Sequence, residues 1–227
     1  MTINTPEQRF IIYYDKLRDE LNTAFTNYEI CKTIREKRAT HRSEYSEAIT
    51  FFTLIMNATL FSTVMSINRF IDSHRDSLHL DIFFKYILDN LHLFSTEAFR
   101  NRLTNQGFDK EYCDDFSKLH KPITAEIVTQ DKKKIENLSV NNLKVWRDKQ
   151  LAHIEKNLVT KNIDIMRQFP VTIKEIDDII STLHEMLNRY RVSFDGVEWV
   201  LGLPSTKPQI EFIFNAISHL QNERKRT

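Results

Sequence analysis

The chain has 227 residues, of which 41% are hydrophobic and 28% are charged, and its formal net charge is +1. This length supplies apolar material for one large core or at most two small ones, and the near-neutral charge excludes a global field that attracts nucleic acid or membranes. Only 3 Gly and 5 Pro occur, whereas β-rich and α/β chains need many turn residues. We therefore predict an all-α fold, an antiparallel helical bundle with additional short helices, as a single domain over residues 1–227.

The same composition bears on cellular location. Cys31 and Cys113 are too few for a disulfide framework and lack metal-ligand spacing, which favours a reduced cytosolic setting. The N-terminus has no basic region followed by an apolar run, so we expect no secretory signal. The stretch from Ala48 to Ile71 comes closest to a membrane helix, but its Thr, Ser and Asn residues are too polar for contact with lipid. We expect a cytoplasmic protein without a membrane span, in which this stretch is the central core helix.

Capping signals and helical spacing predict two long helices at the start of the chain. Thr5-Pro6-Glu7 combines a capping side chain, a proline at the first helical position and an acid in the first turn, so a helix begins here and continues through Arg38. The polar stretch from Ser73 to Ser77 ends the second helix. That helix begins at about Ser43, with apolar positions at Phe51, Leu54, Ile55, Ala58, Phe61, Met65 and Phe70.

Shorter helices follow, separated by Gly, Pro and capping residues. We predict them over residues 81–92, 96–105, 109–119, 125–136, from Ser139 or Asn141 to about Lys156, 173–191 and 208–226. Lys132-Lys133-Lys134 lies within one of them, and Arg224-Lys225-Arg226 ends the last. Because charge runs on helices usually face solvent, we interpret both runs as solvated faces.

One short segment, Trp146-Arg147-Asp148-Lys149-Gln150-Leu151-Ala152-His153, stands out chemically. The sequence has no glycine-rich phosphate loop, HExxH motif or CxxC motif, and its other histidines are scattered. Arginine binds phosphate through two parallel hydrogen bonds and keeps its charge. Histidine exchanges a proton near neutrality, with a reference pKa of about 6.5. Arg147 and His153 together suit phosphodiester chemistry, although an Arg and a His at this spacing also occur by chance in helical proteins.

A straight helix does not place these two side chains side by side. Trp146, Lys149 and His153 share one face at i, i+3 and i+7. The six residues from Arg147 to His153 rotate an α-helix by about 600°, which leaves their side chains roughly 120° apart. Three arrangements remain open: the long arginine bends round, the helix is locally distorted, or a second molecule completes the site.

The segment from Arg147 to His153 resembles the signature of HEPN domains (higher eukaryotes and prokaryotes nucleotide-binding). In that signature an Arg and a polar residue precede a His, with a gap of roughly four to six residues. Its form here is most similar to the abortive-infection AbiU-type branch. A second segment, Ser66-Ile67-Asn68-Arg69-Phe70-Ile71-Asp72 followed by Asp76-Ser77-Leu78, resembles the Arg-x-x-Asp … Ser-Leu segment of that branch. The resemblance covers roughly residues 7 to 190 in layout.

This resemblance implies a HEPN-like bundle that forms a homodimer, with two signature helices making one composite site. It implies a metal-independent endoribonuclease of toxin or anti-phage type, with RNA as substrate, an antitoxin protein as a candidate partner, and no metal or cofactor. By position, His153 would be the general acid/base and Arg147 would hold the phosphate. Asp148 would be the polar residue after the arginine, where the family often has Asn, and would either hold Arg147 or orient His153.

Other residues take supporting roles in this interpretation. Lys144 and Lys149 either track the RNA backbone or only solubilise their helix. Arg69 and Asp72 lie one helical turn apart and form either an ion pair or a brace for the signature helix. HEPN domains without activity exist, so the alternative function is a non-catalytic RNA-binding or protein-interaction module.

Overall fold

The first helix, α1 (Pro6–Thr40), begins where the sequence predicts. The hydroxyl of Thr5 accepts a hydrogen bond from the amide of Gln8 at 3.2 Å, which satisfies one of the donors that a helix N-terminus leaves open. Pro6 takes the first helical position, where its missing N–H costs no hydrogen bond. This computed structural model describes residues 5–72, 77–138, 140–151, 165–202 and 206–226. Within those ranges every regular element is a helix, so the all-α prediction is confirmed.

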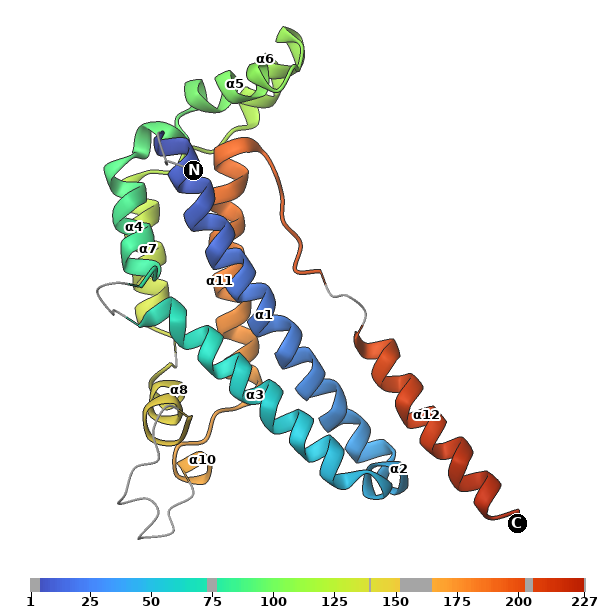
Figure 1. Cartoon of the computed structure of the whole chain (residues 1–227). Coiled ribbons are helices and arrows are strands. Elements are labelled where there is room, and N and C mark those ends of the chain that lie inside the picture. The colour runs from blue at the N-terminus through green and yellow to red at the C-terminus, as the bar shows by residue number, and fades with distance from the viewer. Residues whose placement is uncertain (1–4, 73–76, 139, 152–164, 203–205, 227) are drawn as a thin grey trace. The chain divides into compact units, whose positions relative to one another are not determined.

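Side-chain caps fix three of the later helix starts. The hydroxyls of Ser95 and Thr124 and the carboxylate of Asp109 each accept the backbone amide three residues on. Because a cap is encoded within four residues, these starts agree with the sequence prediction. The elements after α1 are α2 (Arg42–Glu47), α3 (Ile49–Ile71), α4 (Leu80–Asp89), the 3₁₀ helix η1 (Leu91–Phe94), α5 (Thr96–Asn105), α6 (Lys110–Leu119), α7 (Ala125–Glu136), α8 (Asn141–Trp146), the π-helical η2 (Arg147–Leu151), α10 (Ile165–Gln168), α11 (Ile173–Asp195) and α12 (Thr206–Arg224) (Figure 1).

Several elements differ from the sequence prediction, and the predicted helix over 81–92 is observed as α4 followed by η1. The predicted second helix is divided into α2 and α3 at Ala48, whose backbone leaves the helical region at φ −122° and ψ 36°. Alanine favours helix, so local sequence gives no sign of this break. The rings of Tyr45 and Phe52 stack across it with their centroids 5.5 Å apart, which makes packing the physical reason. The short α10 lies in a stretch predicted as a loop.

The chain divides into two compact units. The first unit comprises Met1–Leu21, Arg69–Val140 and Lys174–Val200, and the second unit comprises Asn22–Asn68, Asn141–Ile173 and Leu201–Thr227. Helices α1 and α3 contribute residues to both units. The single domain over residues 1–227 stays a prediction.

An aromatic cluster forms the core of the first unit, where α1, α4, η1 and α11 meet. The ring centroid of Phe10 lies 4.5 Å from that of Phe194, 5.1 Å from Phe94 and 6.0 Å from Phe83. Tyr190 of α11 closes the cluster, with its ring 5.6 Å from Phe83. All five rings are buried. Burial of this aromatic area is therefore the main attraction between these helices.

The hydroxyl of Tyr190 belongs to a buried polar network in the same unit. Asp131 of α7 accepts hydrogen bonds from Arg189 Nη1 at 2.6 Å and from the Tyr190 hydroxyl at 2.9 Å. Burial and the neighbouring carboxylate raise the pKa of Tyr190, so the phenol stays protonated and continues to donate. A buried carboxylate is tolerated here because both of its oxygens have donors.

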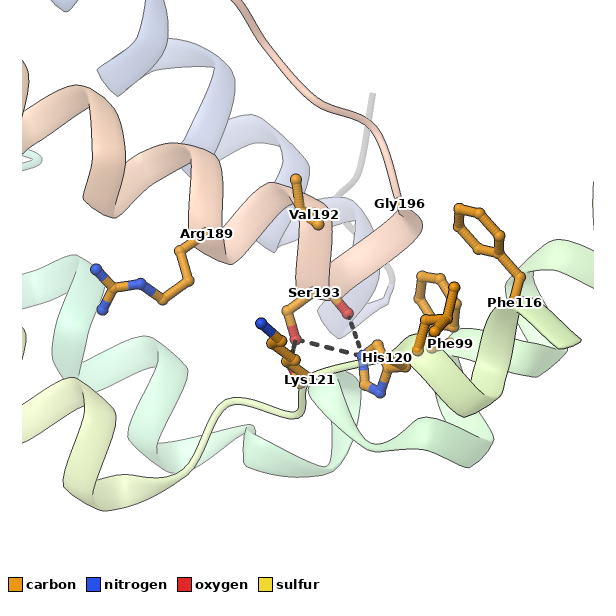
Figure 2. A pocket seen from close by; sticks show the side chains of 9 residues that line it. Phe99, Phe116, His120, Lys121, Arg189, Val192, Ser193 and Gly196 are labelled. Atoms are coloured by element: carbon orange, nitrogen blue, oxygen red, sulfur yellow. Dashed lines mark hydrogen bonds between the residues drawn. The ribbon is translucent and has the colours of Figure 1, made fainter.

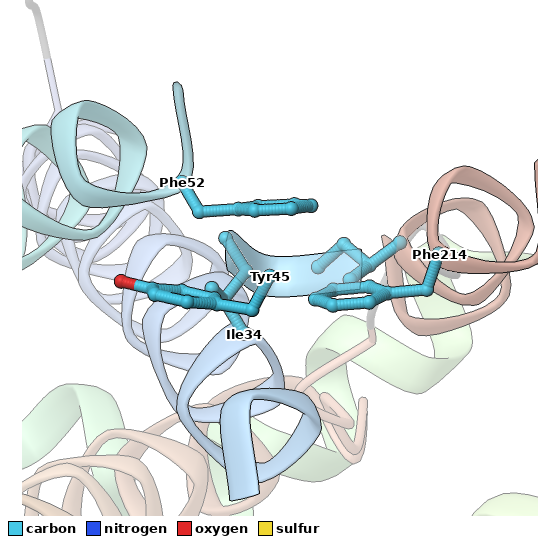
Figure 3. Packing of buried hydrophobic residues seen from close by; sticks show 5 residues of the cluster. Ile34, Tyr45, Phe52 and Phe214 are labelled. Carbon is cyan, nitrogen blue, oxygen red and sulfur yellow. The ribbon is translucent and has the colours of Figure 1, made fainter. Parts of the chain in front are cut away.

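The second unit contains a smaller aromatic core, shown in Figure 3. The ring of Phe52 stacks on Phe214 of α12 at 4.5 Å and on Tyr45 of α2 at 5.5 Å, with interplanar angles of 11° and 13°. Ile34 of α1 and Ile210 of α12 complete the buried cluster. These contacts fix α12 against α2 and the C-terminal half of α1.

The prediction of which face of α3 is buried is wrong over most of the helix, although Phe70 is buried as predicted. Phe51, Leu54 and Phe61 were expected in the core but are 49%, 64% and 42% exposed. The buried face carries Thr59 and Thr63, whose hydroxyls donate to carbonyls one turn earlier in the same helix. Because α3 is apolar around most of its circumference, helical spacing alone does not determine which side faces inward.

Helix α3 is also, within the described ranges, the one helix long and apolar enough to cross a membrane by length and composition. Its apolar window has a mean hydropathy of 1.5, and 28% of that window is buried. Core helices of soluble proteins pass the same test, so this is a weak indication. The cytoplasmic location stays a prediction.

Candidate functional site

The candidate site lies in the second unit, on α8 and η2, and α8 is held by hydrogen bonds to backbone carbonyls. The buried indole of Trp146 donates to the carbonyl of Phe169 at 2.7 Å. The amide of Asn142 donates to the carbonyl of Pro170 at 2.8 Å. The hydroxyl of Tyr28 on α1 in turn donates to the carbonyl of Ile173 at 3.0 Å. The stretch from 169 to 173 therefore connects α8 to α1.

A buried asparagine that sequence reasoning missed connects α8 to α3. The amide nitrogen of Asn68 donates to the carbonyl of Val64 at 2.8 Å and to the carbonyl of Leu143 at 3.2 Å. Both Asn68 and Leu143 are buried. Asn68 belongs to the second segment of the family resemblance, so the structure brings part of that segment to the helix that carries the signature. The sequence signal for this contact was an asparagine within an apolar stretch, because a buried side-chain amide needs hydrogen-bond partners.

The helical hydrogen-bond pattern changes from α to π at Arg147, where the signature begins. From Arg147 to Leu151 the backbone is π-helical, with hydrogen bonds five residues apart. The predicted α-helical spacing therefore does not apply to these residues, and a local distortion was one of the three open arrangements. Single π-helical turns occur frequently at functional sites. His153 lies outside the described residues.

Arg147 and Asp148 are in direct contact. The Nε of Arg147 donates to Oδ1 of Asp148 at 2.7 Å, and their side chains are 19% and 56% exposed. Of the two roles expected for Asp148, the structure records the contact with Arg147. An arginine held through Nε by a carboxylate has its guanidinium plane oriented, which is a common way to position this group for phosphate.

The two predicted lysines lie on the same stretch of chain. Lys144 in α8 and Lys149 in η2 are both half-buried, so only part of each side chain is available to a ligand. Among the residues that the structure describes, no three His, Cys, Asp or Glu side chains gather as a metal-binding group.

Arg69 and Asp72 belong to the first unit rather than the second. The guanidinium of Arg69 pairs with Glu20 of α1 at 2.8 Å, which joins the end of α3 to α1. Arg69, Asp72, Ser77 and Leu78 line one cavity of about 450 Å³ within this unit. The structure thus gathers three polar residues of the second segment, Arg69, Asp72 and Ser77, around a single hollow.

A second cavity of the first unit, of about 340 Å³, contains His120 (Figure 2). The Nε2 of His120 donates to the carbonyl of Ser193 at 2.9 Å, Nδ1 lies 3.1 Å from the hydroxyl of Thr96, and the ring stacks on Phe99 at 4.4 Å. Burial lowers the pKa of His120. Both ring nitrogens are engaged in packing α11 against the chain around α5 and α6, so we interpret His120 as structural.

The sequence model of the HEPN AbiU2 family matches residues 7–204, most of the chain and nearly the span over which the resemblance was seen. The chain belongs to the AbiU2 family of HEPN domains. No curated protein and no solved structure matches it. Membership assigns this AbiU2 domain to the abortive-infection group of HEPN proteins and agrees with its helical fold.

Proposed function

We propose that this AbiU2 domain is a metal-independent endoribonuclease of toxin or anti-phage type, active as a homodimer with one composite site. The observation that supports this most strongly is the family match together with the signature itself. Arg147 and Asp148 stand in contact at a π-helical turn, and the sequence supplies His153 at the signature spacing. RNA is the proposed substrate, and an antitoxin protein is a proposed partner.

The proposed reaction uses a nucleophile that the substrate itself provides. One His153 removes the proton of a ribose 2′-hydroxyl, and the 2′-oxygen forms a bond to the adjacent phosphorus. The phosphorus–O5′ bond breaks, and the partner subunit's His153 protonates the leaving 5′-oxygen. The products are a 2′,3′-cyclic phosphate and a 5′-hydroxyl, so no water or metal-bound hydroxide is needed in this step. DNA lacks the 2′-hydroxyl and is not cut.

Arg147 stabilises the charge that develops on the phosphate. A preoriented guanidinium acts most strongly where water is excluded, and the side chain of Arg147 is mostly buried. Asp148 orients the guanidinium, and Lys144 and Lys149 contact the RNA backbone beside it. A second molecule also removes the geometric difficulty of the sequence, because the reacting groups need not converge from one helix.

A second function, a non-catalytic RNA-binding module, is favoured by one observation. The carboxylate of Asp148 lies 2.7 Å from Arg147 Nε, where it partly neutralises the guanidinium and repels an incoming phosphate. Labelled single-stranded RNA incubated with the protein and a chelator separates the two functions. Fragments with cyclic phosphate ends support the nuclease, whereas retarded but intact RNA supports the module.

The His153→Ala variant tests the catalytic assignment. Removing an acid/base group lowers a rate by about 10²–10⁴-fold, so RNA cleavage should fall below detection while the thermal transition is kept. The matched control is His219→Ala, since His219 is an exposed histidine of α12. Cleavage by a folded His153→Ala protein at the rate of the parent would reject the assignment.

A mixing experiment tests the composite site. If each site needs His153 from both subunits, adding an excess of His153→Ala chains to wild-type chains should lower the activity per wild-type chain severalfold. Unchanged activity per wild-type chain in dimers that exchange subunits would show that one subunit suffices.

A further inference from the structure

Three arginines line one cavity of the second unit. Arg35 and Arg38 project from the end of α1 and Arg42 from the start of α2, around a hollow of about 540 Å³ whose remaining walls include Tyr45 and Ile49. Arg35 and Arg38, at i and i+3, share one face of α1. The backbone leaves the helical region at His41, at φ −124° and ψ 58°, and Arg42 joins the other two as a lining residue of the same hollow. Backbone hydrogen bonds from His41 to Lys37 and from Tyr45 to His41 connect α1 to α2 across this break. We call Arg35, Arg38 and Arg42 the arginine cradle.

The cradle has an excess of positive charge. Within the described part of the chain, none of the three arginines forms an ion pair with a carboxylate. The nearby acids have other contacts: Glu47 pairs with Arg224 at 2.6 Å and Glu211 with Lys37 at 3.3 Å. The carboxylate of Glu44 accepts the hydroxyl of Ser43 at 2.8 Å. That hydrogen bond leaves the charge of Glu44 in place, and Glu36 stands beside Arg35 in sequence, so this stretch sets three guanidinium groups against two carboxylates that form no ion pair among the described residues.

A buried aromatic ring in the wall of the cavity positions the middle arginine. The guanidinium of Arg38 lies over the ring of Tyr45, 5.1 Å from its centroid. Tyr45 is buried and belongs to the aromatic stack with Phe52 and Phe214 (Figure 3). Arg38 therefore gives up little side-chain freedom when it binds a ligand, whereas a solvated cation would have to be ordered first.

We propose that the arginine cradle binds consecutive phosphates of the RNA backbone. This proposal deepens the proposed function and rests on RNA being the substrate. Guanidinium groups match the geometry of phosphate oxygens. The three residues from Arg35 to Arg38 already span roughly 5 Å at helical rise, Arg42 extends the row beyond α1, and a stacked strand carries a phosphate about every 3.4 Å. The row of arginines is therefore longer than one phosphate group. A concave site also fits a single RNA strand better than it fits a flat membrane surface.

Binding of RNA in a background that cannot cut it tests the cradle. In the His153→Ala protein, R35Q/R38Q/R42Q should weaken binding of fluorescein-labelled single-stranded RNA by roughly tenfold or more. It should also reduce the slope of log affinity against log salt by about 2, from three lost phosphate contacts. The matched control is K132Q/K133Q/K134Q, which removes the same charge from an exposed run of α7 and should change the affinity less than twofold. If the triple variant fails to fold, the double variant R35Q/R42Q, which keeps the contact of Arg38 with Tyr45, takes its place in the same measurement.

The outcomes separate this proposal from the nuclease assignment. Equal RNA affinity and salt slope in the folded cradle variants would overturn the cradle, even if wild-type protein cleaves RNA. Cradle-dependent binding by a wild-type protein that cuts no RNA would support the cradle and reject the nuclease. A second binding measurement uses vesicles of phosphatidylcholine and phosphatidylserine, which offer phosphate groups on a lipid surface. Loss of vesicle binding in R35Q/R38Q/R42Q with unchanged RNA binding would overturn the proposal in favour of a lipid surface.

Discussion

The two units of the molecule differ in how completely their polar groups are paired. In the first unit the buried carboxylate of Asp131 has donors on both oxygens, and His120 is engaged at both ring nitrogens. In the second unit α8, which precedes the signature, is held by single side-chain hydrogen bonds to backbone carbonyls, and three arginines lack carboxylate partners among the described residues. The first arrangement gives these buried polar groups partners, which favours stability. The second leaves charge available to a ligand, which is the expected feature of a binding surface.

The largest expected effect of a single change is on the stability of the first unit. Asp131→Ala removes the partner of Arg189 and leaves the buried hydroxyl of Tyr190 without its acceptor. We expect a loss of about 2–4 kcal/mol in the free energy of unfolding, measured by urea titration. Asp89→Ala, which breaks the exposed Lys85–Asp89 pair, should cost less than about 1 kcal/mol. The rate of RNA cleavage by the folded fraction should not change. A lower cleavage rate would show that the network of the first unit also serves the site in the second unit.

A smaller effect is expected for the indole that holds α8. Trp146→Phe keeps a buried ring but removes the donor to the carbonyl of Phe169. We expect a loss of about 1 kcal/mol in stability, together with a lower rate of RNA cleavage, because the signature follows directly on the chain. Trp199→Phe changes the other tryptophan, in the first unit, and should leave the cleavage rate unaltered. Equal rates in both variants would show that this anchor does not position the site.

The charge of Asp148 should have a modest effect on activity. Asp148→Asn keeps an oxygen that can accept from Arg147 Nε and removes a negative charge beside the proposed phosphate position. We expect a cleavage rate equal to or up to roughly tenfold above that of the parent, since one unfavourable charge interaction at about 4 Å, screened by water, is worth about 1 kcal/mol. Asp148→Ala, which removes both the charge and the acceptor, should be slower than Asp148→Asn in the same assay. The reverse order would show that the carboxylate itself takes part in the reaction.

The smallest expected effect is a pH dependence in the first unit. Burial lowers the folded-state pKa of His120 below its unfolded value of about 6.5, so folding favours the neutral ring. Its contribution to stability is present above about pH 6.5 and is lost as the pH falls through the folded-state pKa. His120→Gln retains a donor for the Ser193 carbonyl without titrating. Thermal melts between pH 7.5 and 5 should therefore show a shallower decline for the variant, and parallel curves would contradict the assignment.

Local signals explain how much of the molecule could be predicted from its sequence. The starts of α1, α5, α6 and α7 were found because capping residues act within a single turn. The buried face of α3 was not, because its threonines satisfy their hydroxyls on their own backbone and so tolerate burial. Asn68 and the arginine cradle depend on partners far along the chain or on helix faces meeting in space. Arg35 and Arg38 stand at helical spacing in the sequence, but charged residues on a helix normally indicate a face exposed to solvent.

The π-helical turn at Arg147–Leu151 has a consequence for how relatives of this protein should be aligned. A π-turn contains one residue more than the α-turn it replaces, so it absorbs an insertion without disturbing the chain on either side. The HEPN signature varies in the distance between its arginine and its histidine, and a wide turn at this place is where such a length change does least harm. Deleting one residue here would convert the turn to α-helix and leave the flanking backbone in register, whereas the same deletion within a regular α-helix would rotate the following backbone by about 100°. Relatives with the shorter gap should therefore lack the wide turn, and a letter-by-letter comparison across it would pair residues that point in different directions.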